Sequence, residues 1–544
     1  MNNNIFSYAK PANLPVKLYP AGSEDRKLLK LALEQLQSEA IEIPLIIGGK
    51  EVRTGNLGKA VMPHDHKHVL ATYHKVSEKE VKMAIDAALE AHKSWSEMHW
   101  QDRVAITLKA ANLIEGKYRY LLNAATMLGQ SKNAFQAEID SSCETVDFLR
   151  FNAHFASQIY ADQPISENGI INRMEYRPLE GFVFSITPFN FTAIASNLNM
   201  SPVVMGNTVI WKPSTTSLLS NYFLMKIFME AGLPAGVVNF LPGSGAVIGG
   251  VALNHPHLAG IHFTGSTGVF NSFWETIGAN INAGKYKSYP KIVGETGGKD
   301  FIFAHASADI KALSTAIVRG AFEFQGQKCS AASRAYIPKS IWNDVKKCVG
   351  DMVARIKMGD VCEFTNFVNA VIDEASFDNC MNYINNAKAA KDAEIVIGGK
   401  GDKSKGYFIE PTVILTTNPH YVSMEEEIFG PILTVYVYDD NDLDATLKLC
   451  DETSPYALTG AVWATDRKAL LHMADVLRYA AGNIYYNDKP TGAVVGQQPF
   501  GGARASGTND KAGSLLNLMR WINPRTIKET LVPPTDFMYP TFEA

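Results

Sequence analysis

The chain has 544 residues, of which 46% are hydrophobic and 19% are charged, so it can bury large apolar cores. This composition excludes an intrinsically disordered chain and a small domain held together by disulfides. The 51 Lys and Arg residues nearly balance the 55 Asp and Glu residues, which gives a formal net charge of −4. Since such a balance offers no basic surface for nucleic acid or acidic lipids, we predict neither a nucleic-acid partner nor a membrane partner.

The cysteines and the N-terminal residues bear on the compartment. The six cysteines are scattered without a CxxC pair, which indicates free thiols in a reducing compartment. The first residues lack the apolar core of a secretory signal and the Arg-rich character of a transit peptide. No run approaches the roughly 18 consecutive apolar residues that a membrane span requires. We therefore expect a cytoplasmic protein.

In chain order, the first predicted elements are helices. Leucines at helical spacing predict a helix over residues 24–40, and a capping box formed by Ser77 and Glu80 predicts the start of a second helix. From residue 182 onward, short apolar runs alternate with helical patterns, which is typical of βαβ units around a buried parallel sheet. The elements predicted there are strands at 182–186, 208–211, 237–240 and 260–263 and a helix at 217–231.

A second series of strands is predicted after Lys299, at residues 301–304, 335–337, 432–438 and 460–464. The last predicted strand, residues 526–532, runs directly into Pro533 and Pro534. An unpaired edge strand is prone to associate with another chain. We therefore expect a partner subunit to cover this strand, and the chain to form a homodimer or a dimer-based oligomer.

Three segments place polar and glycine residues where a packed core would not need them. Residues 295–299 put an acid before two glycines, and Asn190 stands between two aromatic residues just past a strand. The third segment presents Cys329 directly after Lys328. A cysteine attacks as the thiolate, and we expect Lys328 and nearby N–H groups to lower the pKa of this thiol. Each segment also has a structural interpretation, as an inert core cysteine, a turn or a helix cap.

Two of these segments, together with two others, resemble the signature segments of the aldehyde dehydrogenase superfamily, in their usual order. The matching segments are residues 295–299, 325–330, 426–431 and 498–502. The resemblance extends from about residue 45 to the C-terminus. Finer details are similar to one branch, the Δ1-pyrroline-5-carboxylate dehydrogenases, and these lie at residues 138–153, 328–330, 491–498 and 500–510.

The resemblance implies an α/β fold of the aldehyde dehydrogenase type, with a variant Rossmann cofactor domain, an α/β catalytic domain and a small β bridging element for oligomerisation. The implied divisions are an N-terminal arm (1–46), an NAD-binding domain (47–157 and 180–297), a catalytic domain (298–505) and the bridging element (158–179 and 506–544). Family resemblance, rather than spacing, brings together residues as distant as Glu295 and Cys329.

The resemblance also implies an NAD-dependent aldehyde dehydrogenase reaction. Cys329 would attack the aldehyde and form a thiohemiacetal, whose oxyanion the Asn190 side-chain amide and the Cys329 N–H would hold. After hydride transfer to the nicotinamide, Glu295 would act as the general base that activates water to hydrolyse the thioester. The implied substrate is L-glutamate γ-semialdehyde, the open form of Δ1-pyrroline-5-carboxylate. Its product is L-glutamate, in the second step of proline degradation.

The cofactor contacts that the resemblance implies are Thr187, Lys212, Gly265, Ser266 and Glu427. No G-x-G-x-x-G motif follows a strand, and the run from Gly243 to Gly249 is interpreted as a turn and a helix start. Many relatives carry an acidic residue three positions after the lysine, where it opposes a 2′-phosphate; here this position is the neutral Thr215. We expect NAD as the cofactor and leave NADP open.

For the substrate, the resemblance implies contacts to the α-ammonium and the α-carboxylate, both at the end distant from the aldehyde, and to the aliphatic stem. The implied contacts are Glu144 for the α-ammonium, Ser330, Gly492 and Ala493 for the α-carboxylate, and Phe191 and Phe500 for the aliphatic stem. The alternative for the two aromatic residues is ordinary core packing, and the alternative for the acid is a solvated helix face.

Other functions stay open at this point. The chain could oxidise another aldehyde, such as succinate semialdehyde, hydrolyse thioesters, or be a non-catalytic binding protein on the same scaffold. His64, His66 and His68 alternate and would share one face of a strand, as metal ligands do. The Asp65 and Lys67 between them favour a solvated turn instead, and the inferred chemistry needs no metal, so we predict none.

Overall fold

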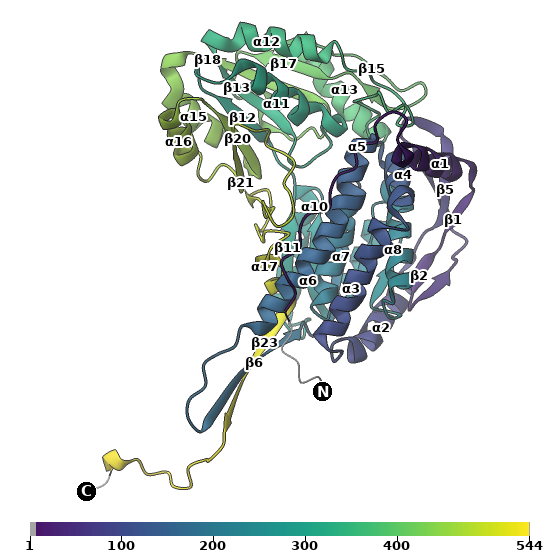
Figure 1. The fold of residues 1–544 in the computed structure, drawn as a ribbon, viewed down its shortest axis with the longest axis vertical. Helices are drawn as coiled ribbons and strands as arrows, with labels where there is room; N and C mark the ends of the chain where they lie inside the picture. Colours follow the sequence, from purple (N-terminus) through teal and green to yellow (C-terminus); the bar gives the residue numbers. More distant parts are fainter. Residues whose placement is uncertain (1–6, 543–544) are drawn as a thin grey trace.

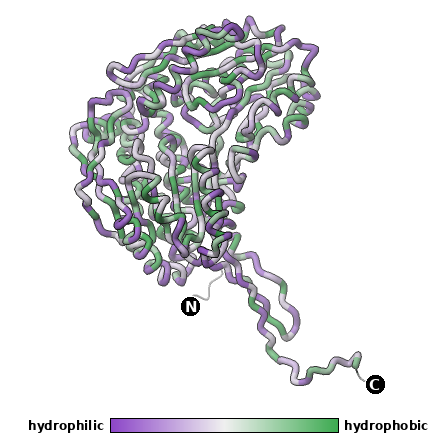
Figure 2. The backbone as a smooth tube through the Cα atoms, turned by 180° about the vertical axis from the view of Figure 1, so that it is seen from behind, coloured by the Kyte–Doolittle hydropathy of each residue, from purple (hydrophilic) through white to green (hydrophobic). Residues whose placement is uncertain are grey.

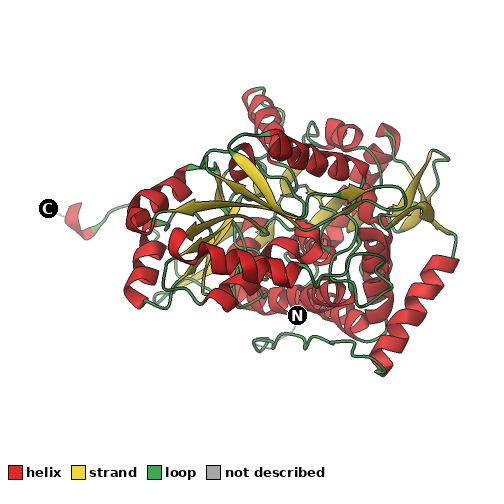
Figure 3. Cartoon of the chain, turned by 90° about the horizontal axis from the view of Figure 1, so that it is seen from above, coloured by secondary structure: helices red, strands yellow, loops and turns green. Residues whose placement is uncertain are grey.

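Two sheets and a projecting ribbon organise the chain. The computed structural model describes residues 7–542, so residues 1–6 of the predicted arm and 543–544 of the predicted bridging element lie outside the described part. Each seven-stranded sheet has helices on both faces, and a two-stranded ribbon extends from the body with the C-terminal segment at its end (Figures 1 and 3). These layers are those of an α/β fold.

The first sheet has the strand order β11-β10-β7-β8-β9-β2-β3. Its parallel strands are β7 (Phe182–Ile186), β8 (Thr208–Lys212), β9 (Val238–Phe240), β10 (Leu258–Thr264) and β11 (Lys291–Glu295), and the antiparallel β2 (Leu45–Ile47) and β3 (Lys50–Val52) extend it. All residues of β7 and β10 are buried, as expected of strands covered on both faces. The chain runs from β7 through β8 to β9 and then returns to β10 on the other side of β7. Such a reversal creates a crevice at the carboxyl ends of β7 and β10, where α/β sheets bind ligands.

Helices cover both faces of this sheet. One face holds α2 (Glu78–Trp95), α9 (Gly245–Ala252) and α10 (Thr267–Asn282), and the other holds α3 (Trp100–Glu115), α6 (Thr145–Ala161), α7 (Thr192–Val204) and α8 (Leu218–Ala231). The predicted capping box is confirmed, because the N–H of Ser77 donates to the Glu80 carboxylate at 3.0 Å. The first predicted helix is α1 (Glu24–Ser38), whose buried leucines pack against α4 (Arg119–Gln130).

The second sheet has the order β14-β17-β18-β13-β12-β20-β21. Its strands are β12 (Asp300–Ala304), β13 (Ala332–Pro338), β14 (Ala393–Ile397), β17 (Thr412–Thr416), β18 (Ile432–Tyr438), β20 (Thr459–Trp463) and β21 (Asn483–Tyr486). One face packs against α11 (Ile310–Phe322) and α12 (Lys339–Val353), and the other against α13 (Glu374–Ala389), α15 (Leu443–Glu452) and α16 (Arg467–Val476). The strands predicted from apolar runs in both halves are confirmed, with ends that shift by no more than three residues.

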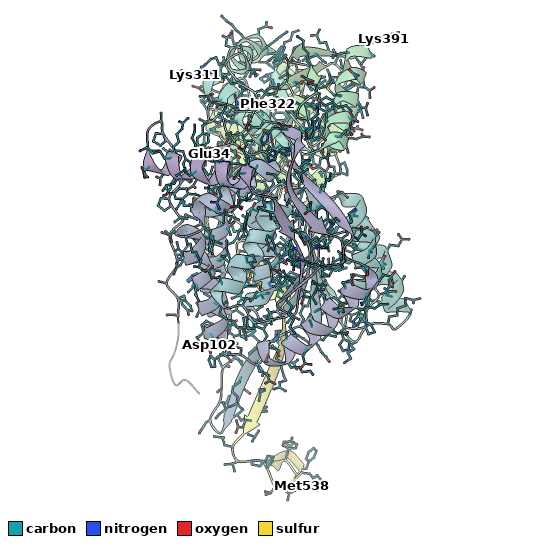
Figure 4. All side chains as sticks on the ribbon, turned by 90° about the vertical axis from the view of Figure 1, so that its right-hand side faces the viewer. Glu34, Asp102, Lys311, Phe322, Lys391 and Met538 are labelled. Atoms are coloured by element: carbon teal, nitrogen blue, oxygen red, sulfur yellow. The ribbon has the colours of Figure 1, made fainter. Side chains whose placement is uncertain are left out.

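The ribbon corrects the expectation of an unpaired last strand. Strand β23 (Ile522–Thr530) begins four residues earlier than predicted and pairs in antiparallel register with β6 (Ile170–Pro178) of the same chain. The two strands project from the body, and hydrophobic and hydrophilic residues mix along them (Figures 1 and 2). The segment after β23 continues outward to a short turn at Pro540–Phe542, and Met538 lies far from the body (Figure 4). Both outer edges of this ribbon lack a neighbouring strand within the described residues.

A three-stranded sheet corrects the interpretation of the three histidines. It consists of β1 (Ile41–Ile43), β4 (Leu57–Met62) and β5 (Asp65–His74), so His66 and His68 lie on a strand rather than in a solvated turn. His64 is in the turn before β5, but its side chain is buried. No group of three His, Cys, Asp or Glu side chains within residues 7–542 is placed to hold a metal ion.

The remaining short elements connect these layers. They are α5 (Ala134–Ala137), α14 (Val422–Glu425), α17 (Leu515–Leu518), β15 (Gly401–Asp402), β16 (Phe408–Ile409), β19 (Tyr456–Ala457) and β22 (Ala503–Arg504). Across the described residues, we find no helix whose length and hydropathy would let it cross a bilayer.

Candidate active site

Cys329 lies on a loop between α11 and β13 that side-chain amides hold in place. Residues 324–326 have φ values of 52°, 55° and 66°, a left-handed run that is strained for the two non-glycine residues. The side-chain amide of Gln325 donates to the carbonyls of Ser131 and Ala370 at 2.9 and 2.8 Å, which compensates this strain. At Gly326 a Cβ atom would stand 2.2 Å from the carbonyl oxygen of Gly430. The loop is therefore rigid, and it leaves the Cys329 side chain buried.

Glu295 ends β11 and is electrostatically coupled to Cys329. Burial raises the pKa of the Cys329 thiol well above its usual value, and the neighbouring Glu295 carboxylate raises it further. Burial likewise raises the pKa of Glu295 to about 7, with a contribution from the charge of Glu427. A carboxyl group with a pKa near neutrality can both accept and release a proton at physiological pH, as a general base must.

The predicted effect of Lys328 on the thiol is wrong. The Lys328 ammonium forms an ion pair with the Glu323 carboxylate at 3.2 Å, with both side chains nearly buried. The Glu323 carboxylate thus compensates the charge of Lys328, and the charged groups that act on the sulfur are carboxylates. The thiol therefore stays protonated until a base removes its proton.

Asn190 lies beside the loop that carries Cys329. Its side-chain amide donates to the carbonyl of Gln327 at 3.1 Å, two residues before the cysteine. A buried ion pair stabilises this position, with the Lys132 ammonium 2.7 Å from the Asp140 carboxylate. The same carboxylate accepts hydrogen bonds from the N–H groups of residues 192 and 193 at the start of α7. The turn between β7 and α7 is thus fixed relative to the nucleophile loop.

The crevice at the carboxyl ends of β7 and β10 forms a cavity of about 800 Å³. All five predicted cofactor residues line it, and so do Asn190 and Cys329. These five are Thr187, Lys212, Gly265, Ser266 and Glu427. The fold therefore brings together, at one edge of one sheet, residues that are spread over more than 200 positions of the chain.

The groups in this cavity fit a dinucleotide. The Lys212 ammonium forms no ion pair among the described residues, and burial lowers its pKa, so a polar ligand would satisfy it. Ser266 caps the N-terminus of α10, where backbone N–H groups favour an anionic phosphate. Glu427 accepts the N–H of Gly298 at 3.0 Å, and at Gly297 a Cβ atom would stand 1.9 Å from its carboxylate. An ammonium, a helix N-terminus and a carboxylate are the partners that ribose hydroxyls and a pyrophosphate require.

One cofactor-side element was missed. The run from Gly243 to Gly249 does form a turn and the start of α9, as interpreted, but Gly245 and Gly249 also line the cavity. The signal was present in the sequence, since small residues repeat at helical spacing directly after strand β9. The apolar side chains of Leu253, directly after α9, and of Val269 in α10 complete this wall.

A second cavity, of about 480 Å³, meets the first at Cys329. The second cavity is also lined by Glu295 and by all six predicted substrate residues, which are Glu144, Phe191, Ser330, Gly492, Ala493 and Phe500. The sulfur atom therefore belongs to the walls of both cavities. Such an arrangement lets two ligands approach one nucleophile from different sides.

Glu144 lies on a π-helix, Glu138–Glu144, between α5 and α6. Such π-bulges are rare and occur frequently at functional sites. Burial raises the pKa of Glu144 to about 8, and the charge of Asp140 acts in the same direction. The alternative of a solvated helix face is therefore wrong, because this carboxyl group faces a cavity.

The other substrate-side residues have identifiable supports. The Lys132 ammonium lies 3.8 Å from the centre of the Phe191 ring, a cation–π contact that orients this aromatic side chain. The Ser330 hydroxyl is 2.7 Å from the Thr491 hydroxyl. This contact links the Cys329 loop to the segment that contains Gly492 and Ala493. Gly492 has a φ of +96°, which explains its identity. Lys489, whose ammonium lies near Gly492, lines the same cavity and was missed because nothing in its local pattern marks it.

Comparison with known proteins agrees with this geometry. A model of the aldehyde dehydrogenase family matches residues 53–527. The chain belongs to this family. The predicted fold of the aldehyde dehydrogenase type is confirmed by solved structures, whereas the predicted domain boundaries stay predictions.

Individual relatives place this family member more narrowly. A Dictyostelium discoideum protein named Delta-1-pyrroline-5-carboxylate dehydrogenase, mitochondrial, is 54% identical over 531 residues, which cover 97% of this chain and 95% of the relative. A probable delta-1-pyrroline-5-carboxylate dehydrogenase of Schizosaccharomyces pombe is 52% identical and covers 97% of each chain. The Delta-pyrroline-5-carboxylate dehydrogenase of Mycobacterium tuberculosis, solved with bound NAD, superposes with a TM-score of 0.96 at 49% identity over the whole of both chains. The predicted resemblance to this branch is thus confirmed.

Proposed function

We propose that this aldehyde dehydrogenase oxidises L-glutamate γ-semialdehyde to L-glutamate with NAD, as the second step of proline degradation. One observation carries the proposal: the cavity that ends on Cys329 presents a carboxyl group, Glu144, and a glycine-containing loop, Gly492 with Ala493. These are the partners that an α-ammonium and an α-carboxylate need. The names of the relatives agree with this substrate.

The chain's own residues supply the nucleophile, the oxyanion site and the base. Glu295, whose pKa is about 7, is the carboxylate coupled to the thiol, so it is the group that accepts the proton of Cys329. The thiolate then attacks the aldehyde carbon, and the Asn190 amide and the Cys329 N–H donate to the resulting oxyanion. Bound NAD accepts the hydride that leaves this carbon. Glu295 then releases this proton to solvent and activates a water molecule, which hydrolyses the thioester, releases the carboxylic acid and regenerates the thiol.

Substrate selection rests on the groups of the second cavity that would bind the α-ammonium and the α-carboxylate, which share one carbon at the end of the substrate distant from the aldehyde. The carboxyl group of Glu144 is held partly protonated by burial, and an ammonium group beside it would favour its charged form. For the α-carboxylate on the same carbon, the donors are the backbone N–H groups of Gly492, which is in left-handed conformation, and of Ala493, both of which line the cavity. The Ser330 hydroxyl, which already contacts Thr491, adds a third donor to the carboxylate. Phe191 and Phe500 flank the aliphatic stem, which runs from this carbon to the aldehyde.

The cofactor is proposed to be NAD, with NADP as the alternative that an experiment must compare. The M. tuberculosis relative is described as bound with NAD. In this chain, the position three residues after Lys212 is Thr215, which has no charge to repel a 2′-phosphate.

The oligomeric state and the compartment are also part of the proposal. The ribbon of β6 and β23 has open edges, and the segment after it exposes Phe537, Tyr539 and Phe542, so we infer a homodimer that covers this region. A monomer in sedimentation at micromolar concentration would contradict this. The cytoplasmic location remains a prediction, and the D. discoideum relative is named mitochondrial.

The decisive experiment compares aldehydes in a steady-state assay of NADH absorbance. We expect kcat/KM for the semialdehyde to exceed that for succinate semialdehyde and propanal, which lack the α-amino group. Parallel assays with NAD and NADP determine the cofactor. Equal kcat/KM values for all three aldehydes would refute the proposed substrate, and NAD reduction without any contribution from Cys329 would refute the proposed nucleophile.

A further inference from the structure

The segment before α1 lies along the body in extended conformation, next to the substrate cavity. Residues 11–19, here called the N-terminal strap, run beside α6 toward α5 and α1 (the dark purple chain in Figure 1). Leu14 and Tyr19 are buried against the body, whereas Val16 is 40% exposed and lines the substrate cavity. Neither the proposed chemistry nor the proposed substrate contacts use this strap.

The strap is anchored on both sides of Glu144. The backbone N–H of Leu14 donates to the Asp147 carboxylate at 2.8 Å, three residues after Glu144. The Tyr19 hydroxyl donates to the Glu138 carboxylate at 2.6 Å, at the first residue of the π-helix. Because these two carboxylates lie before and after Glu144, the strap fixes the irregular helical segment that carries this residue.

Asn13 connects the strap to the loop that begins with Gly492 and Ala493. Its side-chain NH₂ donates to the Asp147 carboxylate and to the carbonyl of Val495, both at 2.8 Å. Its side-chain oxygen accepts a hydrogen bond from the Gln497 amide at 2.8 Å. Asp147 belongs to α6, next to Glu144, and the other two residues belong to the loop that begins with Gly492 and Ala493. One side chain thus holds two segments that lie more than 300 positions apart.

We propose that the N-terminal strap is part of the substrate site and that Asn13 is a positioning residue. It fixes the separation between Glu144 and the backbone of Gly492 and Ala493. An α-amino acid carries its ammonium and its carboxylate on one carbon. A site for both groups must therefore hold Glu144 and this backbone at a set distance from each other. The inference rests on the proposed function, since it concerns recognition of that substrate.

The test is the Asn13→Ala variant of the full chain. It removes all three side-chain hydrogen bonds while the backbone bond of Leu14 stays. We expect KM for the semialdehyde to rise about tenfold, the effect of one to two net hydrogen bonds, with kcat within about twofold. The KM for NAD should stay unchanged. The kcat/KM for propanal, which has neither an ammonium nor a carboxylate, should also stay unchanged. Substrate preference therefore falls, a result that general loosening of the fold does not produce.

Two further variants separate positioning from stability. Gln497→Ala removes the loop side of the same contact, and the double variant with Asn13→Ala should show no larger effect than Asn13→Ala alone. Asn207→Ala is the matched control, since it removes three side-chain hydrogen bonds of another asparagine, which lies just before β8 and lines neither cavity. It should lower the melting temperature without changing the preference between the two aldehydes. Should Asn13→Ala fail to fold, the preference of Gln497→Ala decides.

The outcomes distinguish the two proposals. A wild-type enzyme that oxidises the semialdehyde no better than propanal overturns the proposed function and this inference with it. A wild-type preference that Asn13→Ala and Gln497→Ala both retain overturns the inference alone. An equal loss for both aldehydes, or the same loss of preference in Asn207→Ala, assigns the strap a purely structural role and overturns the inference as well.

Discussion

The two cavities that meet at Cys329 are built in different ways. The cofactor cavity lies on the ends of regular elements: Thr187 follows β7, Lys212 ends β8, and Ser266 begins α10. The substrate cavity is assembled from a π-helix, a loop at positive φ and an extended N-terminal strap. A binding surface on strand and helix ends follows from the topology of the sheet and suits a ligand shared by many enzymes. A surface made of irregular segments requires specific side-chain contacts, and it can therefore be adapted to one substrate.

The most disruptive change removes the atom that both cavities share. Cys329→Ala should lower kcat by at least about a thousandfold, because Cys329 is the only thiol among the described residues that lines both cavities. NADH formation measures the loss, and binding of NAD by calorimetry should persist. Residual turnover near the wild-type rate would mean that the two cavities do not converge on this sulfur.

The base on the cofactor sheet should give the next largest effect. Since its pKa is raised to about 7, Glu295 is ionised above this pH and protonated below it, so kcat should fall as the pH drops through 7. Glu295→Gln should lower kcat about hundredfold and abolish this acidic limb of the pH profile. An unchanged profile in the variant would assign the limb to another group, with Glu427, whose pKa is also about 7, as the next candidate.

Glu144 tests whether the substrate cavity is specialised. Glu144→Gln should raise KM for the semialdehyde roughly tenfold through loss of a charge-assisted contact, with propanal unaffected. Equal changes for the two aldehydes would remove Glu144 from substrate recognition.

The same variant makes a prediction about stability. Burial raises the pKa of Glu144 in the folded enzyme to about 8, from an ordinary value of 4.5. The folded state therefore holds a proton that the unfolded state has lost, and wild-type stability relative to Glu144→Gln falls as the pH rises from 4.5 to 8. Melting temperatures of the ligand-free proteins should show that Glu144→Gln becomes more stable relative to the wild type as the pH rises over this range.

The smallest effect is expected at Ser330. Its hydroxyl contacts Thr491 at 2.7 Å and adds one donor beside the backbone of Gly492 and Ala493. Ser330→Ala should raise KM for the semialdehyde about threefold to tenfold and leave simple aliphatic aldehydes nearly unchanged. A parallel loss for both would show that the hydroxyl orders the Cys329 loop instead of binding the carboxylate.

Prediction from sequence succeeded where the signal was local or carried by a motif. The apolar runs at 182–186 and 432–438 predicted β7 and β18 to the residue, and Ser77 with Glu80 predicted the start of α2. The predicted catalytic and cofactor residues, which only the family resemblance could group, line common cavities. The roles assigned to them remain predictions that the variants above test.

Other expectations failed because they depended on residues distant in the chain. Lys328 was expected to lower the pKa of the adjacent thiol, yet burial and the Glu295 carboxylate, which is distant in the chain, raise this pKa. The last strand was expected to be unpaired, yet it meets β6 about 350 positions earlier. Nothing near Asn13 in the sequence indicates that it contacts Val495 and Gln497.

The sequence by itself thus determined the elements and the family, and it predicted the reacting groups, because periodicity, capping and motif residues act over a few neighbouring positions. The tertiary structure alone decided which charges are compensated, which protons are held and which segments meet around the substrate. Desolvation and ion pairing depend on how closely other atoms approach in space, and that proximity arises only when separate segments pack together.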